Sequence, residues 1–284
     1  MTVALDSPYV VQSTDGLSVS ILATRGLEIT GAWFAGVPLH WKGETSDVYP
    51  DNAWLAGFTQ SLVTTCGLNN VGSPSEGYPL HGDIALIPAT EVTVRQDDDK
   101  TVVGGTITDG SFDLVRTITV EPRSGSLLIE DVVTNHGTER LQAPLLYHVN
   151  WGKPFLGPEL TIDGNVASTV SRDGFPFTAD WRRPFESIET AELVLEHEIR
   201  PDAQGWRALT LTNFPLGIAA RVSWTGLDRV HEWIALHCGA AVVATEPANC
   251  SVLGREHDRE VGNAPYLAAG EVRQTQLLIQ VGRA

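Results

Sequence analysis

Three side chains that can move protons stand out in the sequence: His81, His148 and Glu246. His81 lies in the stretch 64–84, TTCGLNNVGSPSEGYPLHGDI, whose four glycines and two prolines are poor formers of regular structure. A loop of this length inside a compact domain is functional or disordered, and the apolar residues within it favour order. We therefore expect an ordered loop that presents His81, Asn69 and Asn70 to a ligand. The alternative is a long surface connection with an incidental histidine.

His148 lies in the stretch 141–154, LQAPLLYHVNWGKP, between two large apolar side chains. A histidine in such a place is more often a buried core residue than a catalyst. Asn150 and Trp151 follow it directly, and they favour a pocket. Amides bond the hydroxyl groups of sugars, while aromatic faces pack on their C–H groups.

Glu246 ends a strand predicted over residues 240–245 and precedes Pro247. A carboxylate at a strand end can face a pocket. The sequence has no H-x-H or H-E-x-x-H spacing, so we predict no metal site. It also lacks the nucleophile motif G-x-S-x-G and the phosphate-binding motif G-x-x-x-x-G-K-[ST]. The chemistry that remains is proton transfer on a neutral polyol by one carboxylate and one or two imidazoles, without a cofactor.

Composition narrows the choice of partners. The chain of 284 residues has a formal charge of −16, which argues against nucleic acid or an anionic membrane and favours a neutral small molecule. Its three cysteines, Cys66, Cys238 and Cys250, are an odd number without metal-like spacing, which is typical of a reducing compartment. The sequence shows neither a secretory leader nor an apolar run of about 18 residues. We therefore expect a cytoplasmic protein that does not bind membranes.

The elements that must position these residues are predicted to be strands. Apolar runs are short, rich in β-branched residues and bounded by Gly or Pro, and helical periodicity is not sustained over about ten residues. Arg25 stands at a turn among the first strands, where it is either a surface charge or a ligand contact. The sequence predicts one all-β antiparallel domain over residues 1–284. Its main predicted strands are 17–22, 27–29, 32–34, 37–41, 89–95, 101–108, 112–120, 126–134, 159–166, 192–198, 208–213, 217–224, 230–236, 240–244 and 272–281.

Several motifs, read in order, resemble the aldose 1-epimerase (galactose mutarotase) superfamily and within it a branch of bacterial aldose-1-epimerase-like proteins. The resemblance runs from about Arg25 to the end of the chain, and it implies a β-supersandwich with a sugar site in a cleft on one face. The order of the motifs is specific, although each motif alone is weak. They are LEITGAWFAGVPLHW, TTCGLNNVG, YPLHGDIALIPA, VVTNHGTERLQAPLLYHVNWGKPFL and ATEPANC, followed by GR and YLAAGE.

The resemblance also implies roles for the three proton-transfer residues. Glu246 is similar to the family's base, which removes the proton of the anomeric hydroxyl. His148 is similar to the acid that protonates the ring oxygen, and His81 to the histidine that positions the substrate. The ring opens to an aldehyde, the C1–C2 bond rotates, and closure gives the other anomer. No cofactor is needed.

The sequence departs from the family pattern at two places. The family's arginine after the first strands has no clean match, and Arg25 is a possible substitute. Its hydroxyl-binding aspartate is also missing, and Glu232 or Asp228 could take that role. We further expect Trp151, Asn69 and Asn70 to line the sugar pocket.

These departures leave other functions open. The protein could be another epimerase, an isomerase or a lyase of keto- or deoxysugars, or a non-catalytic carbohydrate-binding or sensing protein. The oligomeric state, monomer or homodimer, also remains open.

Overall fold

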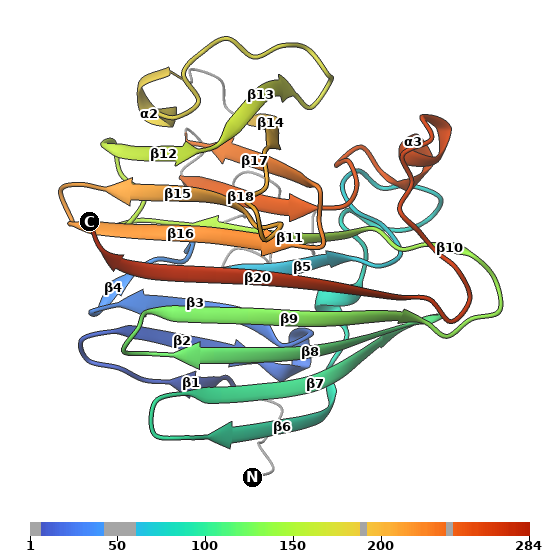
Figure 1. Cartoon of the computed structure of the whole chain (residues 1–284), viewed down its shortest axis with the longest axis horizontal. Coiled ribbons are helices and arrows are strands. Elements are labelled where there is room, and N and C mark those ends of the chain that lie inside the picture. Colours follow the sequence, from blue (N-terminus) through green and yellow to red (C-terminus); the bar gives the residue numbers. More distant parts are fainter. Residues whose placement is uncertain (1–6, 43–60, 188–191, 237–240) are drawn as a thin grey trace.

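The computed structural model describes residues 7–42, 61–187, 192–236 and 241–284. These residues form two large antiparallel sheets that lie one behind the other (Figure 1), which confirms the predicted all-β fold. The first sheet has ten strands, in the order β1-β2-β3-β5-β11-β18-β17-β14-β13, with β4 paired to β3. The second has eight strands, in the order β12-β15-β16-β20-β9-β8-β7-β6.

The elements have the following bounds. The first sheet contains β1 (Tyr9–Val11), β2 (Leu17–Leu22), β3 (Glu28–Phe34), β4 (Val37–Pro38), β5 (Val63–Gly67), β11 (Leu145–Trp151), β13 (Val166–Ser171), β14 (Leu193–Ile199), β17 (Arg229–Ala235) and β18 (Val242–Ala248). The second contains β6 (Thr90–Gln96), β7 (Thr101–Asp109), β8 (Phe112–Glu121), β9 (Ser126–Asn135), β12 (Leu160–Gly164), β15 (Arg207–Asn213), β16 (Ile218–Thr225) and β20 (Val272–Arg283). The short elements are η1 (Ala23–Arg25), η2 (Ile84–Leu86), β10 (Leu141–Gln142), α2 (Pro184–Ser187), α3 (Arg255–Glu260) and β19 (Tyr266–Leu267).

The two sheets differ in how their faces are covered. Along β8 and β9 of the second sheet, buried residues alternate with more exposed ones, so one face packs on the core and the other meets water. Every residue of β11 and β18 in the first sheet is buried. The face of the first sheet turned away from the second sheet, called here the outer face, has its own apolar cluster, which includes Leu146, Trp233 and Ala244.

A buried polar cluster ties the sheets together through the core. The Arg116 guanidinium on β8 donates to both carboxylate oxygens of Asp131 on β9, at 2.9 and 2.6 Å. It also donates to the Thr65 hydroxyl on β5 of the first sheet at 2.7 Å. The Tyr147 hydroxyl on β11 donates to Asp131 at 2.6 Å. The odd-numbered residues of β11 therefore point into the core, and its even-numbered residues point to the outer face.

Two details of these strands differ from the predicted ones. Residues 145–151, which the predicted strands leave out, form the central strand β11. The strand expected to end before Glu246 continues to Ala248, so Glu246 lies inside β18. The β11–β18 pairing has no registered pair between Leu146↔Ala248 and Val149↔Thr245, and Pro247, which has no N–H to donate to the ladder, lies in this gap.

Other expectations concern the cysteines and membranes. Cys66 and Cys250 are buried free thiols, while Cys238 lies outside the described residues. No helix in the described part of the chain is long and apolar enough to cross a membrane.

Candidate active site

The loop between β5 and η2 is held in shape by its own asparagines. The Asn70 amide nitrogen donates to the carbonyls of Ser73 and Pro79, both at 2.9 Å, and its oxygen accepts the backbone N–H of Arg255 at 3.1 Å. Asn69 donates to the Asp83 carboxylate at 3.3 Å. These bonds give both asparagines a structural role in the loop.

The same bonds fasten the loop to α3. The Arg255 guanidinium donates to the backbone carbonyl of Asn69 at 2.6 Å, and Figure 1 shows α3 beside this loop at one end of the sheets. Within this loop, the backbone of His81 has a positive φ of 60°. Its Nδ1 accepts the backbone N–H of Gly72 at 3.4 Å. In a neutral His81 ring, the proton is therefore on Nε2, which can donate.

Five buried side chains form a polar row across the outer face: Glu28 on β3, Thr64 on β5, His148 on β11, Glu246 on β18 and His231 on β17. Strand register aligns them, because Thr64 pairs with His148 and Glu246 pairs with His231. Nε2 of His148 lies 2.9 Å from Oε1 of Glu246. The Thr64 hydroxyl donates to Glu28 at 2.5 Å.

Aromatic rings pack around His148. The His81 ring lies edge-on to it, with ring centres 5.7 Å apart, and the Trp233 indole is similarly placed at 5.5 Å. Trp41 in turn packs against Trp233 at 5.7 Å. The structure thus brings together the three residues selected for proton transfer, His81, His148 and Glu246, and it buries His148 and Glu246.

The charges of the polar row set the protonation of two of its members. Burial acts to raise the pKa of Glu246, but His148, with smaller contributions from His231 and His81, outweighs it and holds that pKa below its ordinary value. Glu246 is therefore a carboxylate at neutral pH. Burial, with the nearby charge of His148, lowers the pKa of His81 to about 3, so His81 is a neutral ring.

The structure does not bring every predicted ligand contact to this row. Trp151 projects from β11 into the core between the sheets, where it is fully buried and its indole N–H donates to the Thr245 hydroxyl at 3.4 Å. Glu232 lies on the same core-facing side, 2.9 Å from Nε2 of His197. Asp228, the other substitute considered for the family's aspartate, lies outside β17 and is exposed.

Arg25 stands at one end of the polar row. Its Nε lies 2.6 Å from a carboxylate oxygen of Glu28, and this bond holds Arg25 beside the row. Burial raises the pKa of Glu28, although Arg25 and the hydroxyls of Thr64 and Ser61 act against that rise.

Sequence analysis missed His231, Thr64 and Glu28 as members of the row. Alternation along a strand could have placed His231 and Trp233 on one face. The partner strand and its register were needed to place that face beside Glu246, and a single sequence does not contain them.

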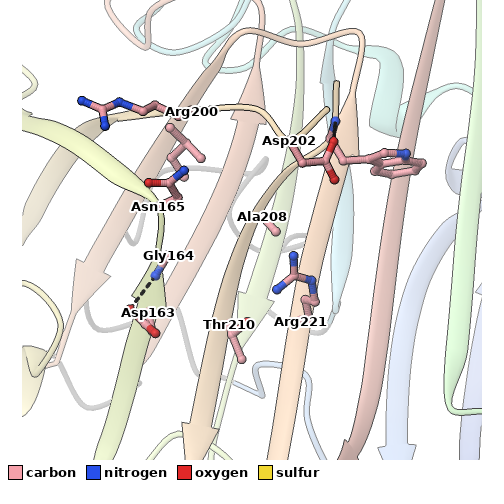
Figure 2. A pocket seen from close by; sticks show the side chains of 10 residues that line it. Asp163, Gly164, Asn165, Arg200, Asp202, Ala208, Thr210 and Arg221 are labelled. Carbon is pink, nitrogen blue, oxygen red and sulfur yellow. Dashed lines mark hydrogen bonds between the residues drawn. The ribbon is translucent and has the colours of Figure 1, made fainter. Parts of the chain in front are cut away.

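A hollow of about 320 Å³ lies elsewhere, on the second sheet and its neighbouring turns (Figure 2). Its lining includes Thr210 on β15, Arg221 on β16, and Asp202 and Trp206 between β14 and β15. One carboxylate oxygen of Asp202 accepts the backbone N–H groups of Gln204 and Trp206, both at 2.9 Å, so it stabilises a turn. None of the residues selected by sequence analysis lines this hollow.

Among the described residues, no group of three or more His, Cys, Asp or Glu side chains is arranged to hold a metal ion. The polar row places the Glu246 carboxylate beside the His148 imidazole, and such side chains can perform acid–base chemistry.

Solved structures show which fold this is. A protein from Klebsiella pneumoniae, provisionally assigned as an aldose 1-epimerase, superposes with a TM-score of 0.80 at 20% identity, over 96% of this chain and 78% of its own. A GalM/aldose epimerase homologue from C. elegans gives 0.68 at 17% identity, over 98% and 99%. A galactose mutarotase-like protein from Clostridium acetobutylicum gives 0.69 at 14% identity, over 96% and 94%. No curated protein sequence matches the chain.

At these identities the likeness establishes the fold alone, and this fold is the one that the motif resemblance implied. A sequence family model assigns the chain more directly. Because the model described as a domain of unknown function, DUF4432, matches residues 8–281, the chain belongs to that family, and it has the galactose mutarotase-like fold.

Proposed function

We propose that this protein is a sugar isomerase of the aldose 1-epimerase type, which interconverts the anomers of a neutral monosaccharide. The observation that carries the proposal is the buried contact of 2.9 Å between Nε2 of His148 and Oε1 of Glu246 on the outer face. Opening a sugar ring removes a proton from the anomeric hydroxyl and adds one to the ring oxygen. Both oxygens are bonded to C1, so the acid and the base that serve them must lie close together.

Each residue takes the role that its protonation allows. Glu246, a carboxylate at neutral pH, accepts the proton of the anomeric hydroxyl. His148 donates a proton to the ring oxygen as the C1–O bond breaks and the aldehyde forms. After rotation about C1–C2, the two groups act in reverse to close the ring. Neutral His81 offers its Nε2–H to a sugar oxygen and holds the ring in place.

The surroundings favour an uncharged sugar. The Trp233 indole beside His148 offers an apolar surface for the C–H groups of a sugar ring. Arg25, the cation at the end of the polar row, is bonded through Nε to Glu28, whose carboxylate offsets its charge. The net charge of −16 also disfavours anionic ligands.

The test is anomer exchange on a panel of freshly dissolved neutral aldoses, followed by polarimetry and by exchange NMR. We expect the wild-type protein to accelerate exchange for at least one sugar, and Glu246→Gln to abolish most of that acceleration. A new sugar in the NMR spectrum would instead identify an epimerase, isomerase or lyase of another kind. Sugar binding that is unaffected by Glu246→Gln, without any exchange, would identify a carbohydrate-binding protein and overturn the proposal.

A further inference from the structure

The polar row contains an imidazole that the proposed chemistry does not use. His231 on β17 is directly opposite Glu246 on β18 and is 1% exposed. Its Nε2 lies 2.9 Å from the backbone carbonyl of Cys250. A carbonyl oxygen can only accept a hydrogen bond, so Nε2 carries the proton, and Nδ1 of the neutral ring is an acceptor.

This Nδ1 is buried and has no hydrogen-bond partner among the described residues. The same is true, within the described part of the chain, of Oδ1 of Asn150 on β11. The Asn150 amide nitrogen is already used, since it donates to Ser61 at 3.3 Å and to the carbonyl of His148 at 3.2 Å. Leaving a buried polar atom unpaired is unfavourable, and such an atom in a native protein calls for an explanation.

Both unpaired atoms are acceptors, and they lie on the strands that flank β18. In the sheet order β11-β18-β17, Asn150 and His148 stand on one side of Glu246, and His231 stands on the other. A surface with spare acceptors fits a ligand that supplies donors, and the hydroxyl groups of a sugar are donors.

We infer that His231 is a third ligand-contacting imidazole, whose Nδ1 accepts the hydrogen of the sugar's C2 hydroxyl. The inference rests on the proposed function. C1 of an aldose ring lies between the ring oxygen and C2. If Glu246 serves the C1 hydroxyl and His148, on β11, serves the ring oxygen, then C2 is directed to the opposite side, toward β17. Directly opposed side chains on one face of a sheet are neighbours, so His231 is the group beside Glu246 on that side.

The variant that isolates this role is His231→Gln. The glutamine amide can still donate to the Cys250 carbonyl, but no acceptor remains at the position of Nδ1. His197→Gln is the matched control, because His197 is also buried, on the adjacent strand β14, but contacts Glu232 on the core side. The melting temperature of each variant reports its fold.

The readout is the ratio of kcat/KM for an aldose and its 2-deoxy counterpart, with D-glucose and D-galactose as the aldoses. We expect wild type to prefer the hydroxylated sugar by about 10-fold or more, as sites built to bond a hydroxyl do. In His231→Gln this ratio should fall close to one, through slower exchange of the hydroxylated sugar alone. His197→Gln should retain the wild-type ratio even if it melts earlier.

The outcomes separate this inference from the proposed function. If wild type exchanges anomers and a folded His231→Gln protein keeps the wild-type ratio, the role inferred for His231 is wrong and the proposed function is retained. If wild type binds sugars without exchanging them, the function is wrong, and the same ratio taken from dissociation constants decides on His231. If no sugar is bound or exchanged, both fall.

Discussion

Two histidine–glutamate pairs lie back to back in the first sheet. On the outer face, Nε2 of His148 is 2.9 Å from Glu246, and on the core-facing side, Nε2 of His197 is 2.9 Å from Glu232. Glu232 and Glu246 belong to the neighbouring strands β17 and β18, and all four side chains are buried. Contact distance and burial therefore do not distinguish the two pairs.

The residues around each pair distinguish the two pairs. Glu246 has His81 and His231 nearby in addition to His148, and together they hold its pKa below the ordinary value although burial acts to raise it. Glu232 lies beside His197, and burial, with a smaller contribution from the charge of Glu246, raises its pKa. On its other side His197 contacts the Thr169 hydroxyl at 2.9 Å, and the Trp181 ring packs on it at 4.3 Å. The outer pair is surrounded by further proton-transfer groups, whereas the core pair is sealed by packing.

The largest expected difference is in turnover. Glu246→Gln keeps the shape of the side chain but removes the base, so it should reduce the rate of anomer exchange by about 10²–10⁴-fold. Glu232→Gln, the same substitution on the opposite side of the sheet, should change this rate by less than about threefold. Both rates are measured by exchange NMR on samples whose folding has been checked by thermal melting.

Coupling between the outer residues sharpens this test. His148→Asn should slow exchange in the same range, and the double variant should lose less than the two single losses combined, because both groups serve one step. Fully additive losses would show that the two residues act in separate steps. A folded Glu246→Gln protein with wild-type turnover would remove the outer pair from catalysis.

The next difference is in stability. His197→Ala leaves the Glu232 carboxylate buried without its imidazole, and breaking such a pair typically costs about 3–5 kcal/mol. We expect a clear fall in the free energy of unfolding in urea, with turnover per folded molecule unchanged. If anomer exchange slowed while the free energy of unfolding stayed unchanged, the core pair would have to influence the site through the sheet.

The alternation of apolar and polar residues in the sequence predicted many of the strands of this fold. The alternation predicted for 112–120 and 126–134 matches β8 and β9 closely, since one face of these strands is wet. The pattern failed for β11, which is buried on both faces and shows no alternation. Without β11, nothing in the sequence showed that His148 and Trp151, three residues apart, point to opposite sides of a sheet.

The sequence predicted some residues of the site and not others. His81, His148 and Glu246 were selected by residue type and local sequence, and the resemblance to a known superfamily then implied their roles. Glu232 and Asp228 were considered because a carboxylate resembles the family's aspartate, and His231, the neighbour of Glu232, was not considered. Which of two adjacent strand residues faces the site depends on cross-strand register, and here it is His231 that pairs with Glu246.

A smaller difference should appear in how stability depends on pH. The folded-state pKa of Glu246 is lowered, so this group stabilises the fold above its ordinary pKa, and that stability is lost as the pH falls through the lowered value. The folded-state pKa of Glu232 is raised, so the fold loses stability as the pH rises through that value. The two carboxylates should therefore give slopes of opposite sign.

Melting temperatures from about pH 3 to pH 7 test these slopes, with effects on the order of 1 kcal/mol. Glu246→Gln should remove the loss of stability at the acid end. Glu232→Gln should remove the loss on the alkaline side of the ordinary glutamate value. If both variants changed the profile in the same direction, the contrast between the two pairs would be wrong.

The smallest effect concerns the proton of His81. Burial and the charge of His148 lower the pKa of His81 to about 3, so its ring should stay neutral from about pH 5 to pH 8, where histidine ordinarily titrates. Its ring signals in NMR, assigned by their loss in His81→Gln, should not move over this range. His148→Asn removes one cause of the lowering and should raise the pKa of His81, whereas Glu246→Gln removes an opposing negative charge and should lower it further. A His81 signal that titrates near pH 6.5 would show a ring open to water, and it would replace the neutral donor proposed for His81 with a second acid beside His148.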